Sequence, residues 1–149
     1  MLDFFPNPLH NRDLGTGMDK LQEKVYLYTS TVAAGFAKPA EEGAEGPLDL
    51  NEHLIRHPAA TFFVRVEGHS MQGAGIFSGD MLIVDRAKEA KTGAVILAVL
   101  GGEFTVKRLV RNGKRVGLQA EHPDFPIVWV HDRDDFAVWG VVTYVIHSL

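Results

Sequence analysis

AVILAVLGGEFTVKRLVRNGKRVGLQA, residues 94–120, is the most informative stretch of this chain. It contains three runs dominated by branched and apolar side chains, as β-strands are. The runs span residues 94–100, 103–110 and 115–120. Gly101-Gly102 and Asn112-Gly113 separate them, and both dipeptides favour two-residue hairpins because they tolerate positive φ angles. The stretch therefore predicts a three-stranded antiparallel meander.

Further strand patterns lie on both sides of the meander. They span residues 61–66, 81–85, 126–130 and 136–146. About seven short strands with frequent turn signals, and no repeat at a fixed period, predict a mainly β fold built on a small twisted barrel-like sheet. One short helix is expected before them, because Asp49 can cap its first turn and Glu52 can complete a capping box, with Pro58 ending it.

Composition changes near residue 45. We expect residues 1–45 to form an arm, ending in a small acidic linker at 41–46, and residues 46–149 to form the folded domain. Within the arm, residues 26–32 are rich in β-formers and suit a docked extended strand, while a weaker helical pattern covers 17–24.

Bulk composition excludes several classes of function. The 149 residues are 46% hydrophobic and 23% charged, as in soluble globular proteins, and no apolar run approaches the ~20 residues of a membrane helix. Residues 1–13 lack the apolar stretch of a secretory signal, so we expect a cytoplasmic protein. A net charge of -4 argues against direct nucleic-acid binding. The absence of cysteine removes disulfides and thiolate chemistry.

Two polar residues lie where they could carry chemistry. Gly68 and its neighbouring glycines form an open loop that presents the hydroxyl of Ser70. Strand alternation puts Lys107 on the face shared with Thr105 and Leu109. Taken alone, such a serine is usually a turn residue that bonds its own backbone, and such a lysine is usually solvated.

Together, Ser70 and Lys107 suggest a nucleophile and its general base, because a neutral amine can accept the serine proton. Only about one ordinary lysine in 2,500 is neutral at pH 7, so the pair needs a mostly apolar pocket that lowers the lysine pKa. Backbone N–H groups of Ser70 and its neighbour His69 could hold the oxyanion. The candidate pocket residues are Val64, Ile83, Val84, Phe104 and Val106.

Several blocks of sequence resemble the LexA/UmuD family of self-cleaving proteases. The blocks are residues 66–71 around Ser70, 79–85, and 103–109 around Lys107. Upstream, Ala33-Ala34-Gly35-Phe36 is similar to the family's Ala-Gly or Cys-Gly cleavage sequence, and the likeness spans roughly 31–145. The resemblance implies a Ser70/Lys107 dyad that cuts between Ala34 and Gly35, with no cofactor.

The segment before the expected cut favours one branch of this family. Only 34 residues precede the cut, too few for the helix-turn-helix domain of LexA and phage repressors, so the closer resemblance is to the UmuD branch. That resemblance implies an SOS-response protein, a homodimer, cleavage stimulated by a RecA filament on single-stranded DNA, and a shortened form that assists a UmuC-like Y-family polymerase in translesion synthesis. The first ten residues have no explanation in this pattern.

Other interpretations stay open. The chain could be a binding module of the same fold with an idle dyad, a relative of the phage and LexA repressors, or a protease acting on other proteins in the manner of signal peptidase. A metal site is not expected. His53 and His57 would share a helix face but lack a third ligand, and Asp132, Asp134 and Asp135 suit a solvated turn.

Overall fold

A computed structural model describes residues 3–5, 25–28, 31–32, 34–36, 43–132 and 134–149. The chain divides into two compact units, one formed by 1–12 with 57–149 and the other by 13–56. Each is described by itself. The division into an arm of residues 1–45 and a domain of residues 46–149 stays a prediction, and the helix expected at 17–24 lies outside the described residues.

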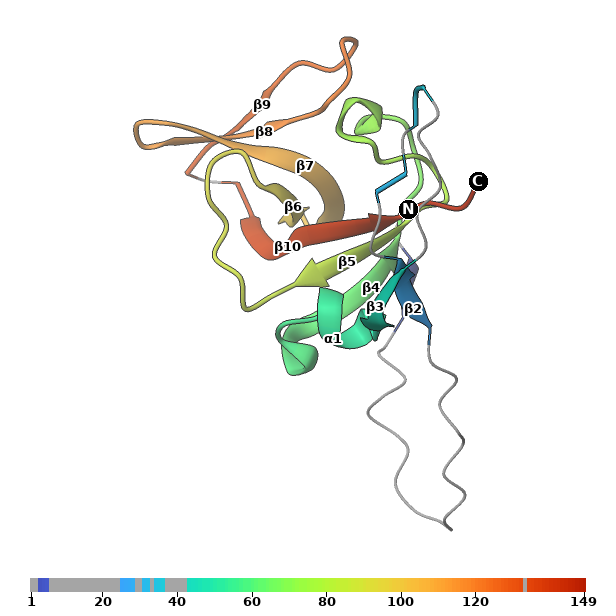
Figure 1. The fold of residues 1–149 in the computed structure, drawn as a ribbon. Coiled ribbons are helices and arrows are strands. Elements are labelled where there is room, and N and C mark those ends of the chain that lie inside the picture. The colour runs from blue at the N-terminus through green and yellow to red at the C-terminus, as the bar shows by residue number, and fades with distance from the viewer. Residues whose placement is uncertain (1–2, 6–24, 29–30, 33, 37–42, 133) are drawn as a thin grey trace. The chain divides into compact units, whose positions relative to one another are not determined.

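The described residues of the first unit form one antiparallel sheet of eight strands. Figure 1 labels β4 to β10 of this sheet. Its strands lie in the order β1-β4-β5-β10-β6-β7-β8-β9. Their bounds are β1 Asp3–Phe5, β4 Thr61–Arg65, β5 Met81–Asp85, β6 Val95–Leu100, β7 Glu103–Asn112, β8 Arg115–Gln119, β9 Val128–Val130 and β10 Phe136–Ile146. Two 3₁₀ turns, η2 Pro58–Ala60 and η3 Gln72–Ala74, lie before β4 and before β5. The predicted mainly β fold is confirmed.

The predicted meander is also confirmed as β6-β7-β8. Leu100 pairs with Glu103 across the first turn, leaving Gly101 and Gly102 as its two central residues, with φ of 60° and 81°. Positive φ at both positions matches the twist of the strands it joins. The second turn lies one residue later than its sequence signal, because Asn112 pairs with Arg115 and the central residues are Gly113 and Lys114.

β10 is the longest strand and joins the two halves of the sheet. It pairs with β5 along one edge and with β6 along the other. Its register shifts between Val142 and Tyr144 against β5, and between Val138 and Gly140 against β6. Such bulges bend a strand and increase its twist. Figure 1 shows β10 running between β5 and β6.

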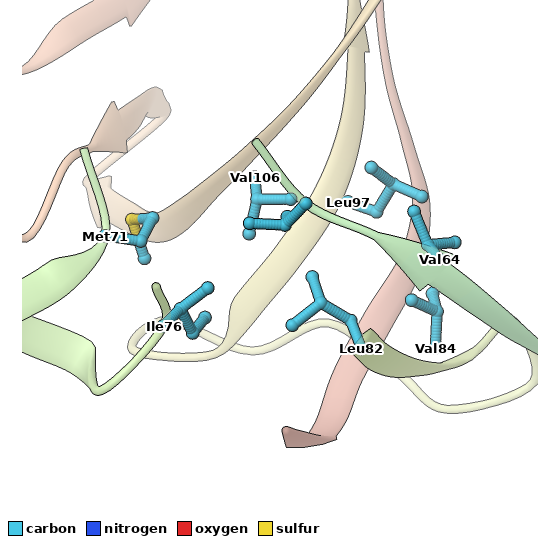
Figure 2. Packing of buried hydrophobic residues seen from close by; sticks show 8 residues of the cluster. Val64, Met71, Ile76, Leu82, Val84, Leu97 and Val106 are labelled. Atoms are coloured by element: carbon cyan, nitrogen blue, oxygen red, sulfur yellow. The ribbon is translucent and has the colours of Figure 1, made fainter. Parts of the chain in front are cut away.

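The buried side chains form two clusters because successive strand residues point to opposite faces. The first cluster comprises Val64, Val66, Met71, Ile76, Leu82, Val84, Leu97 and Val106, and Figure 2 shows its packing. The second comprises Ile96, Ala98, Leu109, Leu118 and Val141. The first cluster matters for function, because it holds β4, β5, β6, β7 and the loop after β4 together.

The described residues of the second unit form a short hairpin and one helix. β2 (Tyr26–Tyr28) pairs antiparallel with β3 (Ala44–Pro47), so part of the expected linker is a strand. The predicted helix is present as α1 (Leu50–Leu54), and the Asp49 carboxylate accepts hydrogen bonds from the N–H groups of Asn51 and Glu52. It ends before Pro58, because Ile55 is already extended.

Candidate active site

Ser70 lies in the loop between β4 and β5, and backbone hydrogen bonds close the base of that loop. Val66 N–H donates to the Asp80 carbonyl at 2.9 Å, and Gly79 N–H donates to the Val66 carbonyl at 2.7 Å. Higher in the loop, Gly68 N–H donates to Ser78 Oγ at 3.2 Å. Met71 and Ile76 are buried in the first cluster. The hydrogen bonds at the base of the loop and the buried side chains of Met71 and Ile76 therefore fix the loop that carries Ser70.

The buried carboxylate of Asp80, 3% exposed, ties this loop to the end of β10. Its Oδ2 accepts from Phe77 N–H at 2.8 Å, and its Oδ1 lies 2.5 Å from His147 Nδ1. The His147 ring also packs against the Phe77 ring, with centroids 5.3 Å apart. One acidic side chain thus satisfies a loop N–H and fixes the loop against a residue 67 positions away.

The other side of the loop contacts the segment after β8. Gly73 N–H donates to the Glu121 carbonyl at 2.8 Å. A Cβ at Gly73 would lie 2.7 Å from that oxygen, so only glycine fits. The Glu121 carboxylate in turn binds the guanidinium of Arg108, the residue after Lys107. This network links the loop that carries Ser70 to the strand that carries Lys107.

Lys107 on β7 meets Ser70 directly. Its Nζ lies 3.1 Å from Ser70 Oγ, 3.0 Å from Thr105 Oγ1 and 3.1 Å from the Val106 carbonyl oxygen. The side chain is partly buried, and burial lowers the pKa of the amine below its usual 10.5 because desolvation disfavours the charged form. The structure brings together the two residues that the sequence singled out, although it does not test their catalytic roles.

Ser70 and Lys107 line an open cleft of about 200 Å³. Phe104 and Val106 line it as expected, but the other expected pocket residues, Val64, Ile83 and Val84, do not. Those three lie in buried strand interiors. Their places on the cleft wall belong to three residues at or beyond the end of β4, Val66, Met71 and Ile76.

The structure also describes the other predicted site residues, and their roles in the reaction stay predictions. Among the described residues, no hydrogen-bond acceptor is found for the backbone N–H of His69 or Ser70, so both stay available as candidate oxyanion donors. Ala34 and Gly35 lie in an exposed bend of the second unit. Small side chains and exposure suit a segment that a nucleophile must reach. Ala33 lies outside the described residues.

The alternative polar clusters have structural roles. α1 ends before His57, so the expected shared helix face of His53 and His57 is wrong. His57 Nδ1 instead lies 2.6 Å from the buried carboxylate of Asp85. Asp134 caps a turn by accepting from His131 N–H at 2.7 Å, as expected of a solvated turn. Within the described part of the chain, no three His, Asp or Glu side chains converge as a metal site would require.

Comparison with known proteins gives the family of this chain and assigns it a serine-peptidase-type fold. The Peptidase S24-like family model matches residues 26–143. The chain is 43% identical to Protein ImpA of Salmonella typhimurium over 123 residues, covering 81% of this chain and 82% of that protein. It is 41% identical to Protein SamA of Salmonella typhimurium strain LT2 over 130 residues, covering 87% and 90%.

A more distant relative is the LexA repressor of Bordetella parapertussis, 38% identical over 128 residues, which are 86% of this chain and 59% of that protein. The chain belongs to the Peptidase S24-like family, and the resemblance to the LexA/UmuD proteases is confirmed. None of the helices among the described residues has the length and apolar character needed to cross a membrane.

Local sequence patterns do not predict the contacts that support the site. Strand alternation puts Thr105 on the face of Lys107 but does not predict the contact of its hydroxyl with the amine. The i, i+2 spacing on one strand was the available signal. No local pattern indicated the contacts of Asp80 with His147 or of Gly73 with Glu121, because each pair is far apart in the sequence.

Proposed function

We propose that this chain cuts itself between Ala34 and Gly35, with Ser70 as nucleophile and Lys107 as general base. The observation that carries the proposal is the 3.1 Å separation of Lys107 Nζ and Ser70 Oγ. That distance lies within the range in which a base takes a proton from a nucleophile. Membership of the Peptidase S24-like family supports the same chemistry.

The contacts of Lys107 suit an amine that has lost its charge. A neutral amine has two N–H donors and one lone pair. The Val106 carbonyl can only accept, and Thr105 Oγ1 can also accept, so these two use both donors. The lone pair is then directed at the Ser70 hydroxyl. Burial lowers the pKa of the amine and so increases the neutral fraction at a given pH.

The reaction is an acyl transfer in two halves. The Ser70 proton moves to Lys107 Nζ as Oγ bonds to the Ala34 carbonyl carbon, and the N–H groups of Ser70 and His69 hold the oxyanion. The Ala34–Gly35 bond then breaks, and the Gly35 nitrogen leaves with the proton from Lys107. Water next gives a proton to the amine and attacks the ester, which releases the Ala34 carboxylate and restores the Ser70 hydroxyl.

Mass spectrometry of purified protein at alkaline pH tests the proposal. A new species beginning at Gly35 should accumulate, because more Lys107 is neutral as the pH rises. Ser70→Ala and Lys107→Ala should each abolish that species, since each removes one half of the dyad. Lys114→Ala, at an exposed lysine in the β7–β8 turn, is the matched control and should cut normally. Normal cutting by either dyad variant would refute the mechanism.

We further propose that the shortened form, Gly35 to Leu149, is an accessory subunit of a UmuC-like Y-family polymerase in SOS mutagenesis. A RecA filament on single-stranded DNA would stimulate the cut. The similarity to ImpA and SamA over most of both chains supports this role. Because these partners act on chromosomal DNA, we place the protein in the bacterial cytoplasm. Adding a RecA filament should raise the cleavage rate at neutral pH, and an unchanged rate would exclude that partner.

We also propose a homodimer. β10 pairs with β6 only as far as Val141, so its final residues have one open edge among the described strands. Tyr144 and Ile146 in this part of β10 are 43% and 47% exposed. An open edge with exposed apolar side chains favours pairing with another chain. Tyr144→Glu should shift sedimentation towards the monomer, and an unchanged dimer would exclude this edge as the interface.

A further inference from the structure

The outer edge of β4 is covered by the first strand of the chain. β1 pairs antiparallel with β4, with Asp3 opposite Arg65, Phe4 opposite Val64 and Phe5 opposite Phe63. β4 has β5 on its other side and leads directly into the loop of Ser70. Three of the ten residues left unexplained by the family resemblance, Asp3–Phe5, therefore form the strand at this edge of the sheet.

Without β1, β4 would be an open edge strand. An exposed strand edge presents a row of unpaired N–H and C=O groups and readily pairs with another chain. Phe62, Phe63 and Val64 give β4 the aromatic and branched composition that favours such pairing. The cover is a strand of only three residues, and it precedes the proposed cut between Ala34 and Gly35.

Cleavage would change how firmly that cover is held. While the chain is intact, the tether keeps β1 at a high effective concentration near β4. After the cut, fragment 1–34 loses its covalent tether, and the pairing of three β1 residues with β4 is too short to keep it bound at the low concentration of a free fragment. The edge of β4 then opens.

We propose that this edge is a strand-addition site, covered by β1 in the uncut chain and taken by an extended segment of a partner protein after cleavage. The inference rests on the proposed function. The register of β1 indicates the chemistry of the partner segment: an acidic residue opposite Arg65, then large apolar residues opposite Val64 and Phe63. Main-chain hydrogen bonds would supply affinity, and the charge opposite Arg65 would set the register.

Peptide binding to the full-length chain tests this proposal. All chains carry Ser70→Ala so that they stay intact. The test chain also carries Phe4→Pro and Phe5→Pro, which remove two successive backbone N–H groups of β1. Successive N–H groups of a strand point to opposite edges, so one of the two must point at β4 and its loss weakens the β1–β4 pairing. The probe is a fluorescent peptide of residues 1–12, followed by anisotropy. It should bind the test chain at least about ten-fold more tightly than the chain with an intact β1, because the tethered strand competes. Equal binding would overturn the proposal.

A charge exchange checks the register. A peptide with Asp3→Arg should bind the test chain about two- to five-fold more weakly, and Arg65→Asp in the test chain should restore its binding. If Arg65→Asp does not restore binding, the proposed register is overturned. If the test chain associates with itself in place of binding the peptide, the proposal that a partner protein occupies the edge is overturned. Peptide binding needs no cleavage. An uncut wild-type chain at alkaline pH would therefore reject the proposed function and leave this result standing.

Discussion

Replacing Thr105 with valine separates two effects of its hydroxyl on Lys107. Thr105 Oγ1 lies 3.0 Å from Nζ and lies with it on one face of β7. Valine keeps the branched shape and removes the acceptor, so the amine loses one of the contacts that orient its lone pair towards Ser70. One hydrogen bond contributes about 0.5–1.5 kcal/mol, which predicts a plateau cleavage rate about two- to twelve-fold lower.

The same substitution should move the pH profile. The ammonium form has three donors and the neutral amine two, so loss of an acceptor destabilises the charged form more. The pKa of Lys107, already lowered by burial, should fall further. Because the neutral amine is the active form, the rising limb of rate against pH should shift to lower pH.

First-order self-cleavage rates across the full pH range measure both effects, since at a single moderate pH they partly cancel. Thr105→Ser is the matched control, because it retains the hydroxyl and should keep the profile close to that of the wild type. The reasoning would be refuted by a Thr105→Val chain whose plateau rate equals that of Thr105→Ser.

Three further substitutions test the scaffold of the site. Gly73→Ala places a methyl group 2.7 Å from the Glu121 carbonyl, so it should lower the unfolding free energy by about 1–3 kcal/mol and slow cleavage, as thermal unfolding and mass spectrometry would report. Asp80→Ala leaves the Phe77 N–H without its acceptor and should lose about 1–3 kcal/mol in urea unfolding, whereas Asp80→Asn, which keeps an oxygen, should lose less. Burial acts to raise the pKa of Asp85, but hydrogen bonds from a histidine and two backbone N–H groups outweigh it and hold the pKa below 3.8. The stability that ionised Asp85 contributes is therefore present above pH 3.8 and lost as the pH falls through its lower folded-state pKa. Asp85→Asn should remove this pH-dependent part of the unfolding free energy. An unfolding free energy whose pH dependence is unchanged in Asp85→Asn would contradict this account.

Local sequence patterns predicted those parts of the fold that depend on local rules. Gly101-Gly102 set its hairpin because two residues with positive φ match the strand twist, and the alternation of residues 103–109 placed Thr105 beside Lys107. The pairing of Ser70 with Lys107 depends on their complementary chemistry and on the family resemblance together, since neither residue is distinctive alone.

Non-local arrangement accounts for what the sequence did not predict. The central position of β10 follows from strand order, which no local pattern encodes. Apolar alternation points to strand interiors as the cleft wall, whereas Met71 and Ile76, which do line the cleft, belong to an irregular loop without periodicity. The contact of Asp80 with His147 joins residues that only the finished sheet brings together.

The place of β10 also sets the timing of the proposed reaction in the cell. Proteins leave the ribosome amino end first, and β10 follows every other strand of the sheet in the chain. Until it emerges, β5 and β6 have no common neighbour. Ser70 lies on one side of that gap and Lys107 on the other. A nascent chain in which β10 has not yet emerged should therefore sever its leader more slowly than one in which β10 joins β5 to β6.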